Sequence, residues 1–493
     1  MPLPSLVPTR RGVLLGGAAL AAAAALPAVV RATTGPVPLR IATRTLDIDG
    51  RAASVLGLLG PDGRPGLVLD RADGFDVELR NEGPDPEIVH WHGLTPPFSL
   101  DGNRVAQAPL LPGEAMRYAF PLARGGTNWM HGHHGLSEGR LLAAPLVVRD
   151  GPMDREEVVL TLSDFSFTPP EEILAGLQRD GGMVGSGIAS WMMGLVRSRG
   201  GMDHGAMGGM GGMDHSRMGG MGMGDMDLND VAFDAFLAND RTLSDPEVVR
   251  VERGAPIRLR VINAATATNF WLDLGGRLAR LVAVDGMPVR PVEGTRFEIA
   301  MAQRLDLEID APTDGTALPV LAQREGDTVR TGLVIAPAGA PVYRIEATAP
   351  SVAPPVGLAM ERRLEAVTSL PDRSTDRAVE LRLTGDMRGY VWGLDGRTWG
   401  NHVPVRVAEG ARVEIAFRNE TMMSHPMHLH GHHFQVVGLG RARLRGAMRD
   451  VVVVPPMESV TVAFDADNRG DWPLHCHNLY HREAGMMTTL SYV

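Results

Sequence analysis

Three stretches of the chain repeat one pattern, and this repeat limits the fold more than any other feature of the sequence. Each stretch begins at a glycine, alternates apolar with polar residues and ends at an asparagine; the stretches span residues 74–81, 254–263 and 410–419. Alternation with a period of two is typical of a half-buried β-strand. Glycine and proline punctuate the short runs around them, and long helical periodicity is scarce. We therefore predict an all-β chain of three tandem Greek-key β-sandwich domains.

The length agrees with this prediction. At 493 residues the chain is too long for one ordinary domain, and its length suggests about three. We place the domains at residues 38–152, 153–342 and 343–493, with the Ala/Pro-rich stretch 336–355 as the second linker.

The first and third repeats share a second feature, a His-x-His motif near the end of the domain. His131-Gly132-His133 precedes a closing strand at 144–148, and His475-Cys476-His477 precedes another at 488–490. The middle repeat has no such motif. The outer domains therefore look like two versions of one unit.

The C-terminal run 475–486 contains the only cysteine of the chain. If this run is extended, His475 and His477 face one side of a strand and Cys476 faces the other, so that one run can serve two metal sites. Cys476, His481 and Met486 offer the thiolate, imidazole and weak thioether of a blue-copper centre. That set lacks one imidazole, which the rest of the chain must supply.

Histidines occur in four clusters that lie in the two outer repeats: His90 and His92; His131 and His133; His425, His428 and His430; His475 and His477. A His-x-His pair places two imidazoles on one face of a strand. Four such clusters among 16 histidines predict metal binding. Aligned zinc sites are the main alternative, but their sequences usually interleave carboxylates.

The charge and the N-terminus limit where the protein works and what it meets. A net charge of −10 argues against a nucleic-acid partner. Residues 9–14 resemble a twin-arginine export motif, and an Ala/Gly/Leu-rich run follows to residue 30, so we predict a signal peptide over residues 1–32, cleaved after Ala28 or Ala32. A membrane anchor is the alternative. We expect a monomeric periplasmic protein without stable membrane insertion.

Residues 200–227 belong to no sandwich, because they consist almost entirely of Gly, Met, His and Asp. We predict a disordered loop inside the second domain. A neutral linker does not explain eight methionines in an exposed stretch, whereas thioether and imidazole together select Cu(I). The candidates for cuprous recruitment are Met202, His204, Met207, Met210, Met213, His215, Met218, Met221, Met223 and Met226.

The four clusters, in this order, resemble the copper signatures of the multicopper oxidases, the family of laccases, ascorbate oxidase and bacterial cuprous oxidases. The resemblance implies cupredoxin-like domains and four copper ions. It assigns His425, Cys476, His481 and the axial Met486 to a type 1 copper, and His90 and His428 to a type 2 copper. The type 3 pair would be held by His92, His131, His133, His430, His475 and His477.

The resemblance also implies a route for electrons and a source of protons. Electrons would enter at the type 1 copper and pass through Cys476 to His475 and His477, and dioxygen would take four of them to become water. Asp101 matches the family's acid near the type 2 copper, although an ordinary Asp-Gly turn is the alternative. Some cuprous oxidases have a second acid directly after the last type 1 histidine; here Arg482 holds that position and Glu483 follows it.

These features predict an exported multicopper oxidase that couples oxidation of Cu(I) to reduction of dioxygen and contributes to copper tolerance. The alternatives are a laccase-type oxidase of small phenolic or aromatic reductants and a copper-binding protein without turnover. Trp91, Trp129 and Trp472 are expected to pack around the clusters. The histidines left without a ligand role are His134, His402, His432 and His433, of which His432 and His433 could orient ligands from behind.

Overall fold

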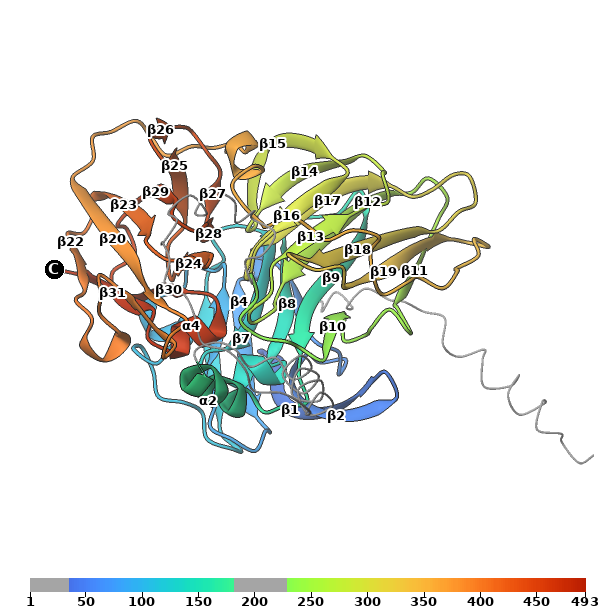
Figure 1. Cartoon of the computed structure of the whole chain (residues 1–493), viewed down its shortest axis with the longest axis horizontal. Helices are drawn as coiled ribbons and strands as arrows, with labels where there is room; N and C mark the ends of the chain where they lie inside the picture. Colours follow the sequence, from blue (N-terminus) through green and yellow to red (C-terminus); the bar gives the residue numbers. More distant parts are fainter. Residues whose placement is uncertain (1–34, 181–227) are drawn as a thin grey trace, which may run out of the picture.

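The computed structural model describes residues 35–180 and 228–493, which form three β-sandwich domains (Figure 1). The predicted signal peptide and the Met-rich stretch 200–227 lie outside the described residues. The first domain runs from blue to turquoise, the second from green to yellow and the third from orange to red in Figure 1. The all-β prediction is confirmed.

Each domain consists of two sheets packed face to face. In the first domain the sheet orders are β2 (Arg51–Leu59), β1 (Val37–Ile48), β4 (Phe75–Asn81), β6 (Ala115–Phe120), and β3 (Leu67–Asp70), β8 (Ala143–Arg149), β7 (Gly126–Gly132), β5 (Val89–His92).

The second domain has one sheet in the order β10 (Ala235–Ala238), β9 (Glu156–Phe165), β12 (Pro256–Asn263), β17 (Arg304–Asp310), β14 (Ala279–Val284), β15 (Met287–Gly294). Its other sheet runs β11 (Val248–Val251), β19 (Arg330–Pro337), β18 (Leu318–Arg324), β13 (Phe270–Asp273), β16 (Arg296–Ile299).

The third domain has one sheet in the order β21 (Val391–Leu394), β20 (Arg377–Asp386), β23 (Arg412–Asn419), β29 (Ser459–Asp465), β25 (Phe434–Leu439), β26 (Ala442–Arg443), with β27 (Met448–Arg449) beside β25. Its other sheet runs β22 (Val405–Val407), β31 (Met487–Tyr492), β30 (Asp471–Cys476), β24 (His425–Leu429), β28 (Val451–Val454).

The described helices are short and lie in the connections. They are α2 (Pro170–Asp180), α4 (Leu479–Glu483) and the 3₁₀ turns η1 (Arg71–Asp73), η2 (Phe98–Leu100), η3 (Ser137–Arg140), η6 (Glu361–Arg363) and η7 (Trp399–Asn401). Ile173 and Leu177 of α2 belong to the same apolar cluster as Leu479 and Tyr480 of α4. The second domain thereby packs against the end of the chain.

The three repeated stretches are β4, β12 and β23, and the side chain of the asparagine that ends each one is buried. Each asparagine donates its amide to two or more backbone carbonyls of the loops around it, and its carbonyl accepts from the backbone two residues on. Such bonds satisfy the backbone polar groups of an irregular loop and so hold the loop in one conformation. The loops held by Asn81 and Asn419 lead to β5 and β24, which carry histidine clusters.

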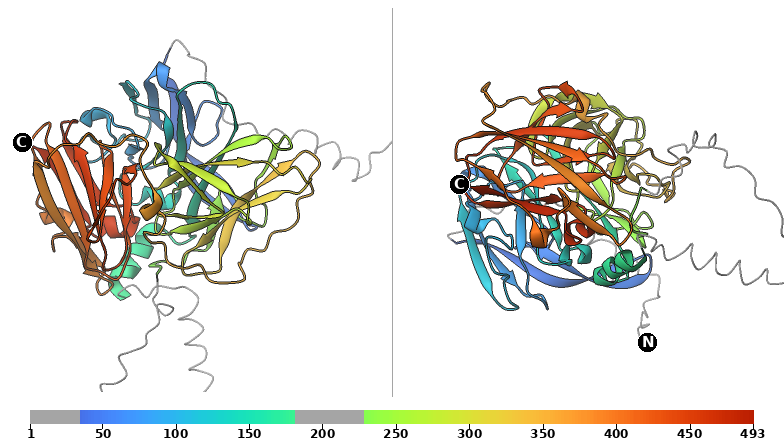
Figure 2. Two further views of the ribbon diagram at one scale, coloured as in Figure 1. Left: turned by 90° about the horizontal axis from the view of Figure 1, so that it is seen from above. Right: turned by 60° about the vertical axis from the view of Figure 1, so that its left-hand side comes forward.

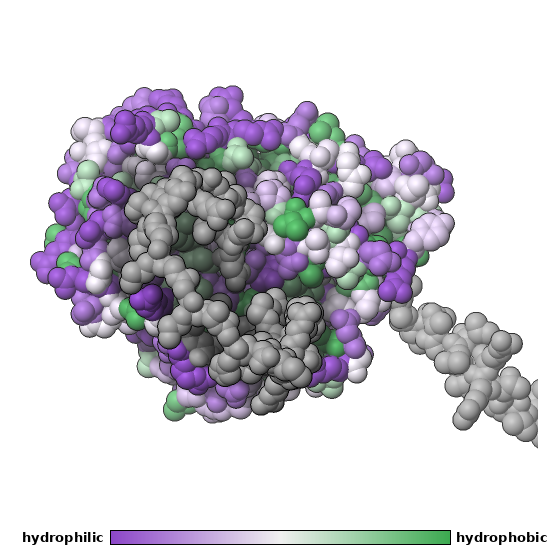
Figure 3. Space-filling view, viewed as in Figure 1, coloured by the Kyte–Doolittle hydropathy of each residue, from purple (hydrophilic) through white to green (hydrophobic). Residues whose placement is uncertain are grey.

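The outer domains meet, and the histidine strands lie at that junction. Asn468 of the third domain donates to the carbonyl of Pro96 in the first at 3.1 Å, and the two domains lie side by side in both views of Figure 2. Trp91, Trp129 and Trp472 are fully buried. Trp129 packs against His92, His131 and His477, whereas Trp91 packs against Phe75 and Tyr118, and Trp472 against Phe98 and His432. Among the described residues, no helix is long and apolar enough to cross a bilayer. On the coloured part of the face shown in Figure 3, hydrophilic residues alternate with intermediate and scattered hydrophobic ones.

Candidate metal centres

One group of buried side chains surrounds the only cysteine. The Sγ atom of Cys476 lies 3.6 Å from Nδ1 of His425 and 3.7 Å from Nδ1 of His481, and these two nitrogens are 3.1 Å apart. All three side chains are buried. His425 supplies the imidazole that the C-terminal run lacks.

The outward nitrogens of these two rings each have a polar neighbour. Thr421 Oγ1 lies 2.8 Å from Nε2 of His425, and Asp230 Oδ2 lies 2.7 Å from Nε2 of His481. A proton on each Nε2 leaves the lone pair of each Nδ1 directed at the cysteine. Two converging lone pairs and a sulfur form a donor set that fits a soft cation.

Burial keeps the His425 ring neutral and the Cys476 side chain protonated in the absence of a neighbouring positive charge. It lowers the pKa of His425 well below its ordinary value, so that the ring is neutral and its lone pair is free. It also raises the pKa of the Cys476 thiol far above its ordinary value, so that the thiolate needs a positive charge beside it. The site therefore fits a metal cation that displaces the thiol proton.

The C-terminal run is extended only as far as Cys476, at the end of β30, and His481 lies on the short helix α4. The Asn478 side chain caps this helix by accepting from the backbone of Tyr480 and His481. The sequence-based reading of the run as a strand thus holds for its first part only. The helical turn is what brings His481 back to Cys476 within five residues.

Met486 is buried behind this helix. Its backbone N–H donates to the carbonyl of His481 at 3.0 Å, and its carbonyl accepts from the N–H of Cys476 at 3.1 Å. The backbone therefore fixes Met486 next to both His481 and Cys476.

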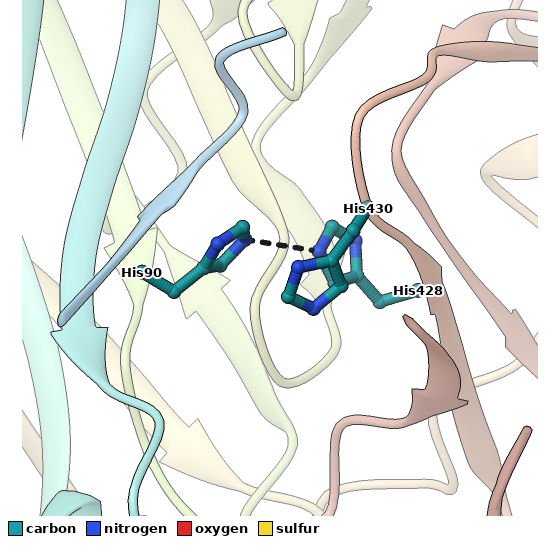
Figure 4. A group of neighbouring side chains, drawn as sticks. All are labelled: His90, His428 and His430. Carbon is teal, nitrogen blue, oxygen red and sulfur yellow. Dashed lines mark hydrogen bonds between the residues drawn. The ribbon is translucent and has the colours of Figure 1, made fainter. Parts of the chain in front are cut away.

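The remaining eight predicted histidine ligands converge between the first and third domains. His90 and His92 come from β5, His131 and His133 from β7 and its end, His428 and His430 from β24 and its end, and His475 and His477 from β30 and its end. Figure 4 shows His90 facing His428 and His430 from the opposite domain. All eight are buried.

The inward nitrogens of these rings approach one another in three sets. Nε2 of His90 lies 3.4 Å from Nε2 of His428. Nε2 of His475 lies 3.4 Å from that of His133 and 3.0 Å from that of His430. Nδ1 of His92 lies 3.4 Å from Nε2 of His131, and the ring of His477 lies 5.0 Å from each of these two rings.

The outward nitrogens of six of these eight rings donate to oxygen atoms of the protein, whereas Nδ1 of His133 has no hydrogen-bond partner among the described residues. The acceptors are the Asp101 carbonyl for His90, Asp450 Oδ1 for His92, the Gly132 carbonyl for His131, the Asp450 carbonyl for His428, Asp101 Oδ2 for His430 and the Cys476 carbonyl for His475, at 2.7–3.1 Å. These bonds turn a lone pair of each ring inward. Burial lowers the pKa of His430 to about 3, and that of His92, His133, His428, His475 and His477 well below the ordinary value.

Neutral imidazoles that point lone pairs at one another repel unless a cation lies between them. Both ring nitrogens of His477 lack a hydrogen-bond partner among the described residues, although they are buried. An orphaned buried nitrogen in such a cluster is the expected state of a metal ligand in a metal-free protein. The cluster therefore fits metal ions.

Asp101 is not an ordinary exposed turn residue, because it is fully buried. Its Oδ2 accepts from Nδ1 of His430 at 2.7 Å, and its Oδ1 has no partner among the described residues. Gly102 lies at φ +80°, and a Cβ there would come within 1.8 Å of the Val89 carbonyl. Only glycine fits this close approach, which presses Asp101 against β5.

The sequence did not single out Asp230, Glu138, Asp450 or Arg304, which contact the clusters from behind. Asp230 lies beside His481; Glu138 lies 3.4 Å from Nδ1 of His131; Arg304 of the middle domain donates to both oxygens of Asp450. Lone acids in strands and loops carry no pattern that marks them. The middle domain, which carries Asp230 and Arg304, thus places side chains behind both centres.

Three of the four unassigned histidines have side-chain contacts of two kinds. His432 donates to the His430 carbonyl and contacts the Tyr492 hydroxyl, and His433 lies 3.4 Å from Asp450 Oδ2 and contacts Arg124, so both support ligands from behind. His402 instead stacks on Trp399 and donates to its carbonyl.

Comparison with known proteins agrees with this arrangement. Three multicopper oxidase family models match residues 41–152, 157–334 and 372–492. Multicopper oxidase MmcO of Mycobacterium tuberculosis is 31% identical and aligns over 94% of this chain and 87% of its own. A copper resistance protein A homolog of Pseudomonas syringae is 26% identical over 91% of this chain and 90% of its own. A multi-copper oxidase structure from Pseudomonas thermotolerans superposes with a TM-score of 0.67 at 24% identity, covering 94% of this chain and all of that one.

Proposed function

The chain belongs to the multicopper oxidases, a family of oxidoreductases, and on this premise we propose that it oxidises Cu(I) to Cu(II) and passes the electrons to dioxygen, which becomes water. One observation carries the proposal: His475-Cys476-His477 joins the cysteine group to the eight-histidine cluster through the backbone alone. Two centres so connected suit a reaction that accepts single electrons at one place and uses four at another.

The proposed copper ligands follow the three inward-facing sets and the cysteine group. Type 1 copper would be held by His425, Cys476, His481 and Met486, and type 2 copper by His90 and His428. The type 3 pair would be held by His133, His430 and His475 on one side and by His92, His131 and His477 on the other. When bound, copper supplies one-electron redox chemistry at the first site and reduction of dioxygen at the cluster.

The protein's own residues provide the path between these sites. Cys476 is bonded covalently to His475 and His477, and its carbonyl also accepts from Nδ1 of His475 at 2.9 Å. Burial alone would raise the pKa of Asp101, but His90 and His430 outweigh burial and hold this pKa well below its ordinary value, so Asp101 is an anion whose free oxygen can accept a proton in transit beside the cluster. The buried rings of the cluster and Trp129, which packs against them, exclude bulk water.

The choice of cuprous ion rests on soft donors and one acid near the cysteine group. The Met-rich stretch ends at residue 227, and Asp230, which lies beside His481, follows three residues later. Met422 and Met423 come shortly before His425, and the Met422 side chain is exposed. Thioethers bind Cu(I), and a carboxylate beside a ligand ring stabilises the oxidised ion.

The test is deletion of residues 200–227, with oxygen uptake measured on Cu(I) and on a phenol. We expect cuprous oxidation to fall while phenol oxidation is kept or improved. A matched control keeps the length of the stretch and replaces its eight methionines by leucine; it should lose cuprous oxidation as the deletion does. Equal loss on both substrates would contradict a cuprous function and favour a phenol oxidase that merely carries the stretch.

We also infer export and a role in copper tolerance. Both rest on the twin-arginine pattern at Arg10-Arg11 and on the copper-resistance relative. Fusing residues 1–35 to a reporter and changing both arginines to lysine should stop export through the twin-arginine route; unaffected export would contradict the signal.

A further inference from the structure

Arg482, the residue that follows His481, is buried, and all three nitrogens of its guanidinium group donate hydrogen bonds. It is 3% exposed. Its Nη1 donates to Glu138 Oε2 at 3.0 Å, its Nη2 to the Gly135 carbonyl at 3.3 Å and its Nε to Glu483 Oε1 at 3.1 Å. Arginine suits this position because its planar guanidinium spreads donors over three nitrogens and so reaches three separated acceptors, whereas the ammonium of lysine is a compact point charge.

These contacts form part of a chain of alternating charges between the outer domains. Arg104 of the first domain donates to Glu483 of the third at 3.2 Å, and Arg482 of the third domain donates to Glu138 of the first. Helix α4, which carries His481, is thereby tied to the first domain at two points.

Glu138 in turn lies between the outward nitrogens of two histidines from different domains. Its Oε2 is 3.4 Å from Nδ1 of His131, and its Oε1 is 3.8 Å from Nδ1 of His477. Oε1 and both nitrogens of His477 lack hydrogen-bond partners among the described residues. The carboxylate, which is 2% exposed and held by η3, faces two rings of the set formed by His92, His131 and His477.

We propose that Glu138 is a positioning residue that orients both His131 and His477 for one of the two type 3 copper ions, and that Arg482 holds it there as an anion. The inference rests on the proposed copper assignment. At 3.4 and 3.8 Å, the contacts of Glu138 with these two rings are longer than hydrogen bonds, and Nδ1 of His131 also donates to the Gly132 carbonyl. An anion on this side of both rings favours the tautomer with its proton on Nδ1, which directs the Nε2 lone pair of each ring inward. Burial of an unpaired carboxylate is costly, and Arg482 offsets this cost.

The same geometry accounts for the arginine at position 482. An acid there would face Glu138, and two buried carboxylates in contact repel. Glu138 of the first domain is thus the acid beside this half of the cluster, and Arg482 neutralises its charge. If Glu138 and Arg482 formed only a structural ion pair, Glu138 would have no reason to lie beside both His131 and His477.

The test compares Glu138→Gln and Glu138→Ala with Glu157→Gln in the copper-loaded full chain. Glu157 is a matched control: it is equally buried, receives Arg149 and Arg260, and contacts no histidine among the described residues. The readouts are copper ions per chain, the blue band, and the electron-spin signal, in which a coupled type 3 pair is silent.

We expect Glu138→Ala to lose type 3 copper or to gain spin signal from an uncoupled ion, with the blue band kept. Glu138→Gln has a similar shape and keeps one acceptor, so its loss should be smaller; it also serves if the alanine variant does not fold. Glu157→Gln should lower thermal stability and leave all copper signals unchanged.

Two results would overturn the inference: a silent pair in both Glu138 variants, or the same loss of coupling in Glu157→Gln. A wild-type protein that takes up copper without a blue band or a silent pair would instead contradict the proposed function. The two failures are therefore distinguishable.

Discussion

Arg304 ties all three domains together, and its replacement by methionine should weaken the fold strongly. Its side chain is fully buried. It donates to Asp450 of the third domain at 2.7 and 2.5 Å, to the Thr127 carbonyl of the first at 3.2 Å and to the Ala302 carbonyl of its own at 3.0 Å. Methionine keeps much of the length of the side chain and removes every one of these donors.

The expected cost follows from what Asp450 loses. Burial alone raises the pKa of Asp450, but Arg304 outweighs burial and holds this pKa far below its ordinary value. Without Arg304 the carboxylate is a buried charge with the imidazoles of His92, His433 and His428 beside it. Removing one partner of a buried ion pair typically costs about 3–5 kcal/mol. This is a large fraction of the roughly 5–15 kcal/mol that stabilises a typical domain.

The assay is urea unfolding of the copper-free protein, followed by tryptophan fluorescence and circular dichroism, because three domains need not unfold in one step. Arg443→Met is the control. Arg443 also makes two hydrogen bonds to one carboxylate, Glu414, at 3.0 and 2.7 Å, but its side chain is 61% exposed. An exposed pair contributes less than about 1 kcal/mol.

The reasoning would be refuted if Arg304→Met and Arg443→Met shifted the unfolding midpoint equally. A double variant that also carries Asp450→Asn should recover part of the loss, because it leaves no buried charge unpaired. No recovery would mean that Arg304 acts through packing and not through its charge.

Three further predictions concern single side chains. Asp230→Asn should raise the reduction potential of the cysteine centre, since an anion beside His481 stabilises the oxidised ion, and should lower cuprous oxidation by about 10–100-fold; redox titration and oxygen uptake check this, and an unchanged potential would contradict it. Burial raises the pKa of Glu325 from 4.5 to about 7. Below pH 4.5 this carboxyl is neutral in both the folded and the unfolded protein, so its contribution to the free energy of unfolding is fully present there. The contribution is lost as the pH rises from 4.5 through about 7, because the unfolded chain ionises first. Between pH 4.5 and about 7, the free energy of unfolding of the wild type should therefore fall by about 3 kcal/mol relative to that of Glu325→Gln, as measured by unfolding at several pH values. A difference between the two proteins that does not change with pH would exclude the raised pKa. Gly102→Ala should lower thermal stability by about 1–3 kcal/mol or more, because φ is +80° and the new Cβ would meet the Val89 carbonyl; a melting curve like that of the wild type would contradict it.

The sequence alone predicted the fold and the ligand clusters because both are written in local patterns. Alternation identified β4, β12 and β23, and the His-x-His spacing placed two rings on one face without knowledge of the fold. The role of the asparagines at the ends of these strands was not predicted, because it depends on carbonyls from loops that only the folded chain brings near.

Residues that act from behind the clusters could not be found in this way. Asp230 and Asp450 are single acids, and Glu138 lies in a short turn with Gly139 and Arg140, which reads as an exposed loop. Their importance comes from contacts across domain boundaries over hundreds of residues, such as that between Arg482 and Glu138. The sequence marked Arg482 only as a departure from a pattern; its partner required the structure.

The central claim is that Cys476 holds a blue copper ion connected to a separate cluster of histidine-bound copper. The most direct measurement is the absorption and electron-spin spectrum of the copper-loaded protein beside Cys476→Ser. A serine cannot provide the thiolate, so the variant should lose the blue charge-transfer band and turnover, while the type 2 copper signal from the His90–His428 site is kept. A blue band that persists in Cys476→Ser would contradict the account.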